Sequence, residues 1–191
     1  KNIFKHQYVL FFGIVELYND IEVLKNLDNE ISKNQSIYKN LKIVFRPHPS
    51  RPNLFLHSKK VNFFKNIIFD PNMKKYLKTK NKKYLENKNL YFERLLSNSL
   101  FNVGGLTTVT IESLIFKKKQ IFYCYSEKDN ITDPKSLFIN SMHFDKIDKV
   151  SALIKSRSIS SVVKNFRKLY IHKTYSKINK NLDNEISYFY N

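Results

Sequence analysis

The chain has 191 residues, of which 42% are hydrophobic, and a formal net charge of +18 at pH 7. Its length allows one substantial hydrophobic core, and no apolar run approaches the roughly 18 residues that a transmembrane helix needs. The single cysteine, Cys124, excludes an internal disulfide and a zinc site built from cysteines, and we expect it to be an inert core residue. Because no signal peptide is visible, we expect a cytoplasmic protein.

Short apolar runs alternate with helical patterns along most of the chain. Apolar residues at positions 21, 24, 27 and 31 predict an amphipathic helix, and residues 72–89, rich in Lys, Asn and Tyr, indicate an exposed helix or loop. A short helix is expected over 91–97, and strands are predicted over 8–15, 41–45, 66–69, 100–103 and 120–125. This alternation predicts a Rossmann-like α/β fold, with a parallel sheet and helices on both of its faces.

The last part of the chain has a different pattern. Residues 126–135 are polar and form a predicted loop. His143 beyond it is a candidate for a functional site, the alternative being a helix-capping or packed histidine. Residues 148–189 show helical patterns without turn signals. We therefore divide the chain into a Rossmann-like domain over 1–147 and a carboxyl-terminal helical extension over 148–191 that packs on it.

Residues 41–49 form an apolar run that ends in Arg46-Pro47-His48-Pro49. A bounded run of β-branched and aromatic residues is typical of a buried strand, and ligands of open α/β sheets bind at the carboxyl ends of strands. The two prolines restrict the backbone on both sides of His48, so its imidazole would lose little entropy on binding an anion. The alternative is a turn that leaves the sheet and carries a surface histidine.

A second motif lies in residues 98–116, which we interpret as a strand, a glycine turn and a helix. Two of the three glycines, Gly104 and Gly105, stand in that turn, which indicates a positive φ or the close approach of another group. Thr107 and Thr108 stand where a helix N-cap belongs. Because free N–H groups and the helix dipole would face the strand ends, the motif predicts an anion site. It has neither a P-loop lysine nor the pattern GxGxxG, so neither a Walker-type NTPase nor an NAD enzyme is indicated.

Glu112 follows Thr108 by four residues and so shares its helical face. From there its carboxylate would accept hydrogen bonds from a ribose diol. A capping-box glutamate would need a hydroxyl residue three positions earlier, but position 109 is Val. The remaining alternative is an acid that only complements the helix dipole.

The two motifs, in this order and at this spacing, resemble the carboxyl-terminal half of GT-B glycosyltransferases. The resemblance covers about residues 8–147 and is strongest to the bacterial surface-polysaccharide group, which includes sialyl- and polysialyltransferases, Kdo transferases and CDP-glycerol glycerophosphotransferases. In that group a His-Pro motif and a paired Ser/Thr motif grip the donor phosphates. The resemblance implies that His48 with Pro49, and Thr107 with Thr108, hold the donor phosphates and that Glu112 holds the ribose. From the residues themselves we expect Arg46, Gly104 and Gly105 to belong to the same site, and His48 to be catalytic by stabilising or protonating the departing phosphate.

This resemblance also implies a reaction. The expected activity is a metal-independent glycosyl or phospho-polyol transfer in cell-surface polysaccharide synthesis, such as capsule assembly. The substrates would be a CMP-, CDP- or UDP-linked donor and a glycan or lipid-linked acceptor, with no cofactor. GT-B enzymes have two Rossmann-like domains, whereas this chain shows one, so we expect that an amino-terminal domain with the general base is missing.

The net charge of +18 raises other possibilities. Lysines are spread through the chain together with Asn and Ile, and no RNP-like motif, zinc finger or arginine cluster is present, so we expect no nucleic-acid partner. Peripheral contact with the anionic inner face of the plasma membrane explains the charge better than nucleic-acid binding does. Plain solubility together with codon bias explains it at least as well. Two alternatives stay open: a sugar-nucleotide epimerase of the same fold, and a basic module that binds nucleic acid or a membrane surface.

Overall fold

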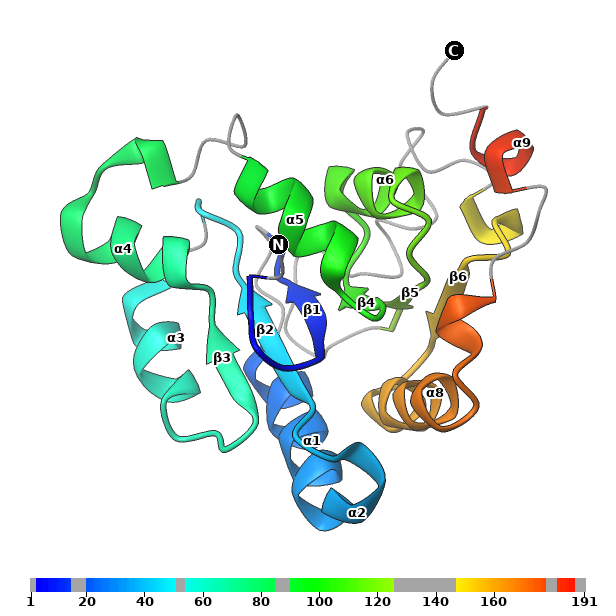
Figure 1. The fold of residues 1–191 in the computed structure, drawn as a ribbon, viewed down its shortest axis with the longest axis horizontal. Coiled ribbons are helices and arrows are strands. Elements are labelled where there is room, and N and C mark those ends of the chain that lie inside the picture. Colours follow the sequence, from blue (N-terminus) through cyan, green and yellow to red (C-terminus); the bar gives the residue numbers. More distant parts are fainter. Residues whose placement is uncertain are drawn as a thin grey trace.

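The computed structural model describes residues 3–14, 20–50, 54–84, 90–125, 147–177 and 182–187. Within them, six strands form one parallel sheet in the order β3-β2-β1-β4-β5-β6 (Figure 1). This is the strand order of a doubly wound Rossmann fold, whose ligands bind where the order reverses. The strands are β1 (Tyr8–Phe12), β2 (Lys42–Arg46), β3 (Ile67–Phe69), β4 (Asn102–Gly104), β5 (Gln120–Tyr123) and β6 (Leu153–Ser156).

Helices cover both faces of the sheet. Figure 1 shows α5 and α6 on one side of it and α1 and α8 on the other. Short 3-10 segments occur at η1 (Lys82–Tyr84), η3 (Ile147–Lys149) and η4 (Thr174–Ser176). The α-helices are α1 (Asp20–Lys33), α2 (Gln35–Tyr38), α3 (Leu54–Val61), α4 (Pro71–Thr79), α5 (Leu90–Asn98), α6 (Thr108–Ile115), α8 (Ile159–Ile171) and α9 (Leu182–Ser187).

The alternation of side chains along β1 explains this layering, because successive residues of a strand point to opposite faces. Val9 and Phe11 lie in the larger core cluster, with the inner sides of α1 and α8. Tyr8, Leu10 and Phe12 lie in the second cluster, against α5. All five residues are buried, as expected for a central strand that is covered on both faces.

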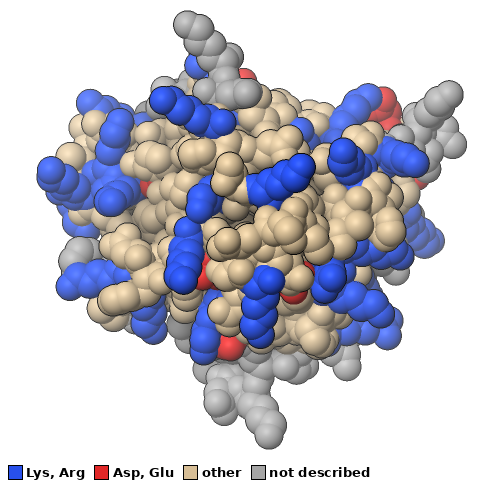
Figure 2. Space-filling model, turned by 60° about the horizontal axis from the view of Figure 1, so that its bottom comes forward, with Lys and Arg blue, Asp and Glu red and all other residues tan. Residues whose placement is uncertain are grey.

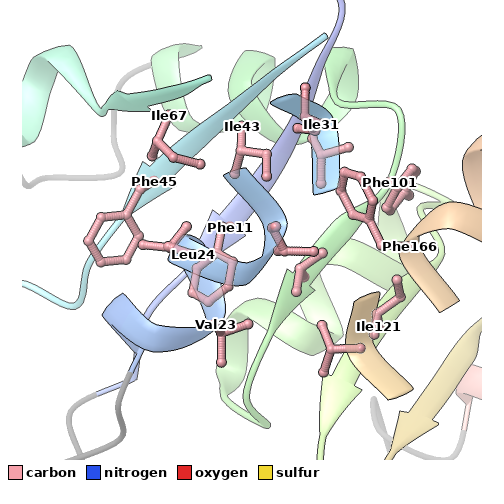
Figure 3. Packing of buried hydrophobic residues seen from close by; sticks show 14 of the residues in the cluster. Phe11, Val23, Leu24, Ile31, Ile43, Phe45, Ile67, Phe101, Ile121 and Phe166 are labelled. Atoms are coloured by element: carbon pink, nitrogen blue, oxygen red, sulfur yellow. The ribbon is translucent and has the colours of Figure 1, made fainter. Parts of the chain in front are cut away.

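Figure 3 shows the larger cluster from close by, with Phe11 and Phe45 of neighbouring strands near Leu24 of α1. The rings of Phe11 and Phe45 meet edge to face, with centroids 5.6 Å apart. Phe166 of α8 packs in the same cluster, also edge to face, with its centroid 5.4 Å from that of Phe101. The described residues include no helix that is long and apolar enough to cross a bilayer.

The predicted Rossmann-like α/β class is confirmed, with strands at all five expected places. The expectation of helices alone in 148–191 is wrong, because β6 pairs with β5 along Gln120–Tyr123 and extends the sheet. A boundary at residue 147 stays a prediction. Helix α3 was not predicted, whereas the exposed helix expected in 72–89 is α4, followed by η1. The loop at 126–135 and His143 lie outside the described residues.

Candidate functional site

A cavity of about 370 Å³ opens at the carboxyl ends of β1 and β2, beside the amino end of α6. Parallel strands bring their carboxyl ends to one edge of the sheet, which explains why motifs far apart in sequence meet there. The cavity contains six of the eight predicted site residues, and its lining is Phe12, Gly13, Arg46, Pro47, His48, Pro49, Phe92, Thr107, Thr108, Val109 and Glu112.

The turn after β2 lies directly against the turn after β1. The N–H of Gly13 donates a hydrogen bond to the carbonyl of Arg46 at 2.9 Å. A Cβ atom on Gly13 would lie 2.7 Å from Oδ2 of Asp20 and 3.2 Å from Cα of Pro47, so only glycine fits there without a shift. Sequence reasoning missed this residue, and the only available signal was the rarity of glycine in the chain.

His48 is half-buried between its two prolines and has a defined tautomer. Its Nδ1 accepts a hydrogen bond from the N–H of Ser50 at 3.2 Å. A ring nitrogen that accepts carries no proton, so the proton of the neutral ring is on Nε2. Burial lowers the pKa of His48 below its ordinary value of 6.5. At neutral pH the free site therefore contains an uncharged imidazole that donates through Nε2.

Arg46 lines the cavity but is already engaged. Its Nη1 donates to Oδ2 of Asp70 at 2.8 Å, and its guanidinium lies over the ring of Phe92, 4.9 Å from the centroid. Asp70 is fully buried, so the pair is well shielded from solvent. Asp70 thus balances much of the positive charge of Arg46 in the free protein. Arg46 therefore attracts a phosphate less strongly than we expected from the sequence.

Asp70 connects three elements around this arginine. Its Oδ1 accepts hydrogen bonds from the N–H groups of Asn72 and Met73, which makes it the N-cap of α4. The same oxygen accepts from the hydroxyl of Tyr91 on α5 at 3.1 Å. The sequence analysis predicted a strand over 66–69, directly before Asp70, and gave Asp70 itself no role. The signal for its capping role was the proline that follows it, since proline is favoured at the first helical position.

The amino end of α6 forms the opposite side of the cavity. Thr107 is its N-cap, as predicted: Oγ1 of Thr107 accepts from the N–H of Val109 at 3.2 Å. In return, the N–H of Thr107 donates to Oγ1 of Thr110 at 3.2 Å. Thr108 is exposed at the first helical position. The positive end of the helix dipole therefore faces the cavity, next to the turn that holds His48.

Gly104 and Gly105 lie behind the cavity, outside its lining. Neither glycine has a positive φ, so that alternative is wrong, and the alternative of close approach is confirmed. A Cβ atom on Gly104 would lie 2.5 Å from the backbone oxygen of Phe12, and one on Gly105 would lie 2.9 Å from Cγ2 of Ile14. Their absent side chains allow β4 and the turn after it to lie close to β1.

A buried polar network attaches α6 to the sheet, and sequence reasoning did not anticipate it. Nδ2 of Asn102 donates to Oγ of Ser113 at 2.9 Å, and Nε2 of Gln120 donates to Oγ1 of Thr110 at 3.2 Å. These four side chains are fully buried. Because buried polar groups are costly when unpaired, the network favours one position of α6 over others that would break it. The direction of the helix amino end is thereby fixed.

Glu112 lies one turn further along α6 and also lines the cavity. Burial raises the pKa of its carboxyl, and the guanidinium of Arg46 opposes that rise. The cavity thus combines a donor imidazole, a helix amino end and a carboxyl acceptor. The imidazole and the helix amino end are donors for an anion, and the carboxyl is an acceptor for hydroxyl groups on the same ligand. Among the described residues, no group of three or more His, Cys, Asp or Glu is placed to hold a metal ion.

The strand order defines a Rossmann-like α/β domain, and its cavity lies at the carboxyl edge of the sheet, where the ligands of such folds bind. No protein-family profile matches the chain, and no curated protein matches its sequence. Among solved structures it is similar to TarM, with a TM-score of 0.51 and 13% identity. The match covers 100% of this chain and 34% of TarM, so the chain spans about one third of that protein. The similarity shows that the chain has the fold of the matching part of TarM.

Proposed function

We propose that the chain is the donor-nucleotide-binding part of a glycosyltransferase, or of a related phospho-polyol transferase, in cell-surface polysaccharide synthesis. One observation carries the proposal: a single cavity contains His48, the amino end of α6 and Glu112. These are the groups that a nucleotide-linked donor needs for its phosphates and its ribose. The TarM-like fold supports the proposal, because TarM is itself a glycosyltransferase.

The phosphates would lie between His48 and the first turn of α6. Backbone N–H groups at a helix amino end and the helix dipole favour an anion there. The Nε2 proton of His48 adds a donor whose direction is set by the hydrogen bond from Ser50 to Nδ1. Glu112, one turn deeper on the same helical face, would accept hydrogen bonds from the ribose hydroxyls.

In the transfer step, negative charge grows on the phosphate of the departing nucleotide. The helix amino end and His48 are held in place before reaction, so they stabilise this charge without further reorganisation. His48 would also transfer its Nε2 proton to that phosphate as a general acid. The group that activates the acceptor hydroxyl would come from outside this chain, and the reaction would need no metal.

Arg46 has a different part in this proposal from the one that the sequence suggested. Because its Nη1 is bound to Asp70, it acts mainly by fixing the start of the turn that carries His48. Its remaining charge would hold the pKa of the Glu112 carboxyl below the value that burial alone would give it. The carboxylate form is the one that accepts hydrogen bonds from a ribose.

Calorimetric titration with CMP, CDP, UDP and GDP tests the proposal. We expect one nucleotide to bind selectively, and both His48→Ala and the double variant Thr107→Ala/Thr108→Ala to weaken it by about 10-fold or more, since a hydrogen bond to a charged group contributes roughly 1.5–3 kcal/mol. The matched control is Ser158→Ala, which removes the N-cap of α8 at a distance from the cavity. Equal losses in the control and in the cavity variants would contradict the proposal.

Nucleotide binding should also take up a proton. The pKa of His48 is lowered in the free chain, and a phosphate beside it favours the imidazolium, which raises that pKa in the complex. Affinity should therefore increase as the pH falls through the pKa of the complex, and level off below the pKa of the free chain. A nucleotide sugar is the suitable probe, because its esterified phosphate or diphosphate does not titrate near neutral pH.

Calorimetry in buffers of different ionisation enthalpy measures this uptake directly. Wild type should bind up to about one proton per nucleotide sugar near pH 7, whereas His48→Gln should bind none. The glutamine retains a side-chain donor, so the variant separates protonation from loss of a contact. If His48→Gln took up as many protons as wild type, the assignment of His48 to the phosphate would be wrong.

A further inference from the structure

One dense cluster of lysines lies on α4 and η1. Between positions 74 and 83 lie six lysines and no acidic residue, and all six are exposed. The one acid in the described stretch 54–84 is Asp70, which is fully buried and already occupied by Arg46 and the N-cap contacts. We call this surface the α4–η1 face, defined by Lys74, Lys75, Lys78, Lys80, Lys82 and Lys83.

The lysines and the apolar side chains of α4 lie on opposite sides of the helix. Met73 is fully buried, and Tyr76 and Leu77 pack partly buried against the main core. The lysines at 74, 75 and 78 stand on the outer side of the same helix. The spacing is that of an amphipathic helix, so the cationic side is fixed by how the helix is anchored.

Some of these lysines contact aromatic rings. Lys75 and Lys83 both lie over the ring of Tyr84, at 5.7 and 5.2 Å from its centroid, and Lys80 lies 6.0 Å from that of Tyr76. Elsewhere in the described structure basic residues do meet acids, as in the pair of Lys117 with Asp183 at 3.0 Å. Among the ion pairs of the described residues, none contains Lys74, Lys75, Lys78, Lys80 or Lys82, so the positive charge of these five lysines faces solvent.

We propose that the α4–η1 face binds the anionic lipid headgroups of a membrane surface. Four to eight clustered lysines on an amphipathic helix contribute about 1 kcal/mol each near such a surface. Tyrosines are favoured at the level of the headgroups, and Tyr76 and Tyr84 stand among these lysines. Arginine, whose planar guanidinium forms paired hydrogen bonds with phosphates and with guanine, is absent from residues 54–84.

The position of the face agrees with a docking role. Helix α4 follows β3, the edge strand of the sheet, and lies at one extreme of the molecule (Figure 1). None of the six lysines lines the cavity at the carboxyl edge. Figure 2 shows basic side chains over the whole visible surface, so the test has to separate a local face from total charge. The proposal does not depend on the activity proposed above.

Vesicle co-sedimentation of the 191-residue chain tests it. The probes are phosphatidylcholine vesicles with and without 30% phosphatidylglycerol, compared at roughly 0.05 M and 0.5 M salt. The test variant replaces Lys74, Lys75, Lys78 and Lys82 by Gln. The control variant makes the same charge change at four other exposed lysines, namely Lys149, Lys164, Lys168 and Lys177.

Wild type should bind only the anionic vesicles, and high salt should release it. The test variant should lose roughly 10²–10³-fold in partitioning, from four lysines at about 1 kcal/mol each, whereas the control should stay close to wild type. Equal losses in both variants, or no binding by wild type, would overturn the proposal. Tighter binding to duplex DNA or RNA than to vesicles, lost in the test variant alone, would assign the face to nucleic acid instead and would also overturn it.

Discussion

Replacing Asp70 by alanine should lower the free energy of unfolding by about 3–5 kcal/mol, because the change leaves the buried guanidinium of Arg46 without its partner. The variant also loses the N-cap of α4 and the acceptor of the Tyr91 hydroxyl. Urea unfolding followed by circular dichroism measures this difference. Asp70→Asn should cost less, since asparagine is itself a good N-cap residue, so the pair of variants separates capping from charge.

The control for this experiment is Asp183→Ala. Its partner Lys117 lies at 3.0 Å, but both side chains are more than half exposed, so removal of the pair should cost less than about 1 kcal/mol. If Asp70→Ala and Asp183→Ala were equally stable, the conclusion that Asp70 stabilises the fold by connecting Arg46, α4 and α5 would be wrong.

Gly104→Ala should destabilise the chain by about 3 kcal/mol, at the upper end of the range for overpacking. The new Cβ would lie 2.5 Å from the backbone oxygen of Phe12 and 2.7 Å from two of its ring carbons. Phe12 and Gly104 are paired between β1 and β4, so neither can move without disturbing the sheet. Because Phe12 lines the cavity, displacement of its ring should also weaken nucleotide binding.

Gly105→Ala is the matched comparison at the next position. Its Cβ would meet Cγ2 of the Ile14 side chain at 2.9 Å, and a side chain adjusts more easily than a paired backbone. We expect a smaller loss of stability in the same urea experiment. An order in which Gly105→Ala is the less stable variant would show that backbone approach at Gly104 is not the limiting contact.

Local sequence pattern was sufficient for most of the sheet. The run that became β2 is bounded and apolar, and Ile43, Val44 and Phe45 are fully buried. Strand β6 was missed because it is a short edge strand in which Leu153, Ile154 and Lys155 are only partly buried. An edge strand of that kind has neither a continuous apolar run nor a clear alternation, so helical spacing in its surroundings dominated the prediction.

Features of the candidate site were predictable from sequence where they depend on the residues of one short segment. Thr107 as an N-cap follows from local hydrogen bonding alone, and the structure confirms it. The partnership of Arg46 with Asp70 depends on β2 and β3 being neighbours, which no local pattern specifies. The contact of Gly13 with the turn after β2 depends in the same way on the pairing of β1 and β2.

The central claim is that nucleotide phosphates bind between His48 and the amino end of α6, and chemical-shift mapping by NMR tests it most directly. On titration with the nucleotide selected by calorimetry, we expect saturable shifts of the Thr108 and Val109 amides and of the His48 imidazole nitrogens. Shifts confined to the lysines of α4 and η1, or no saturable shift with CMP, CDP, UDP or GDP, would contradict it.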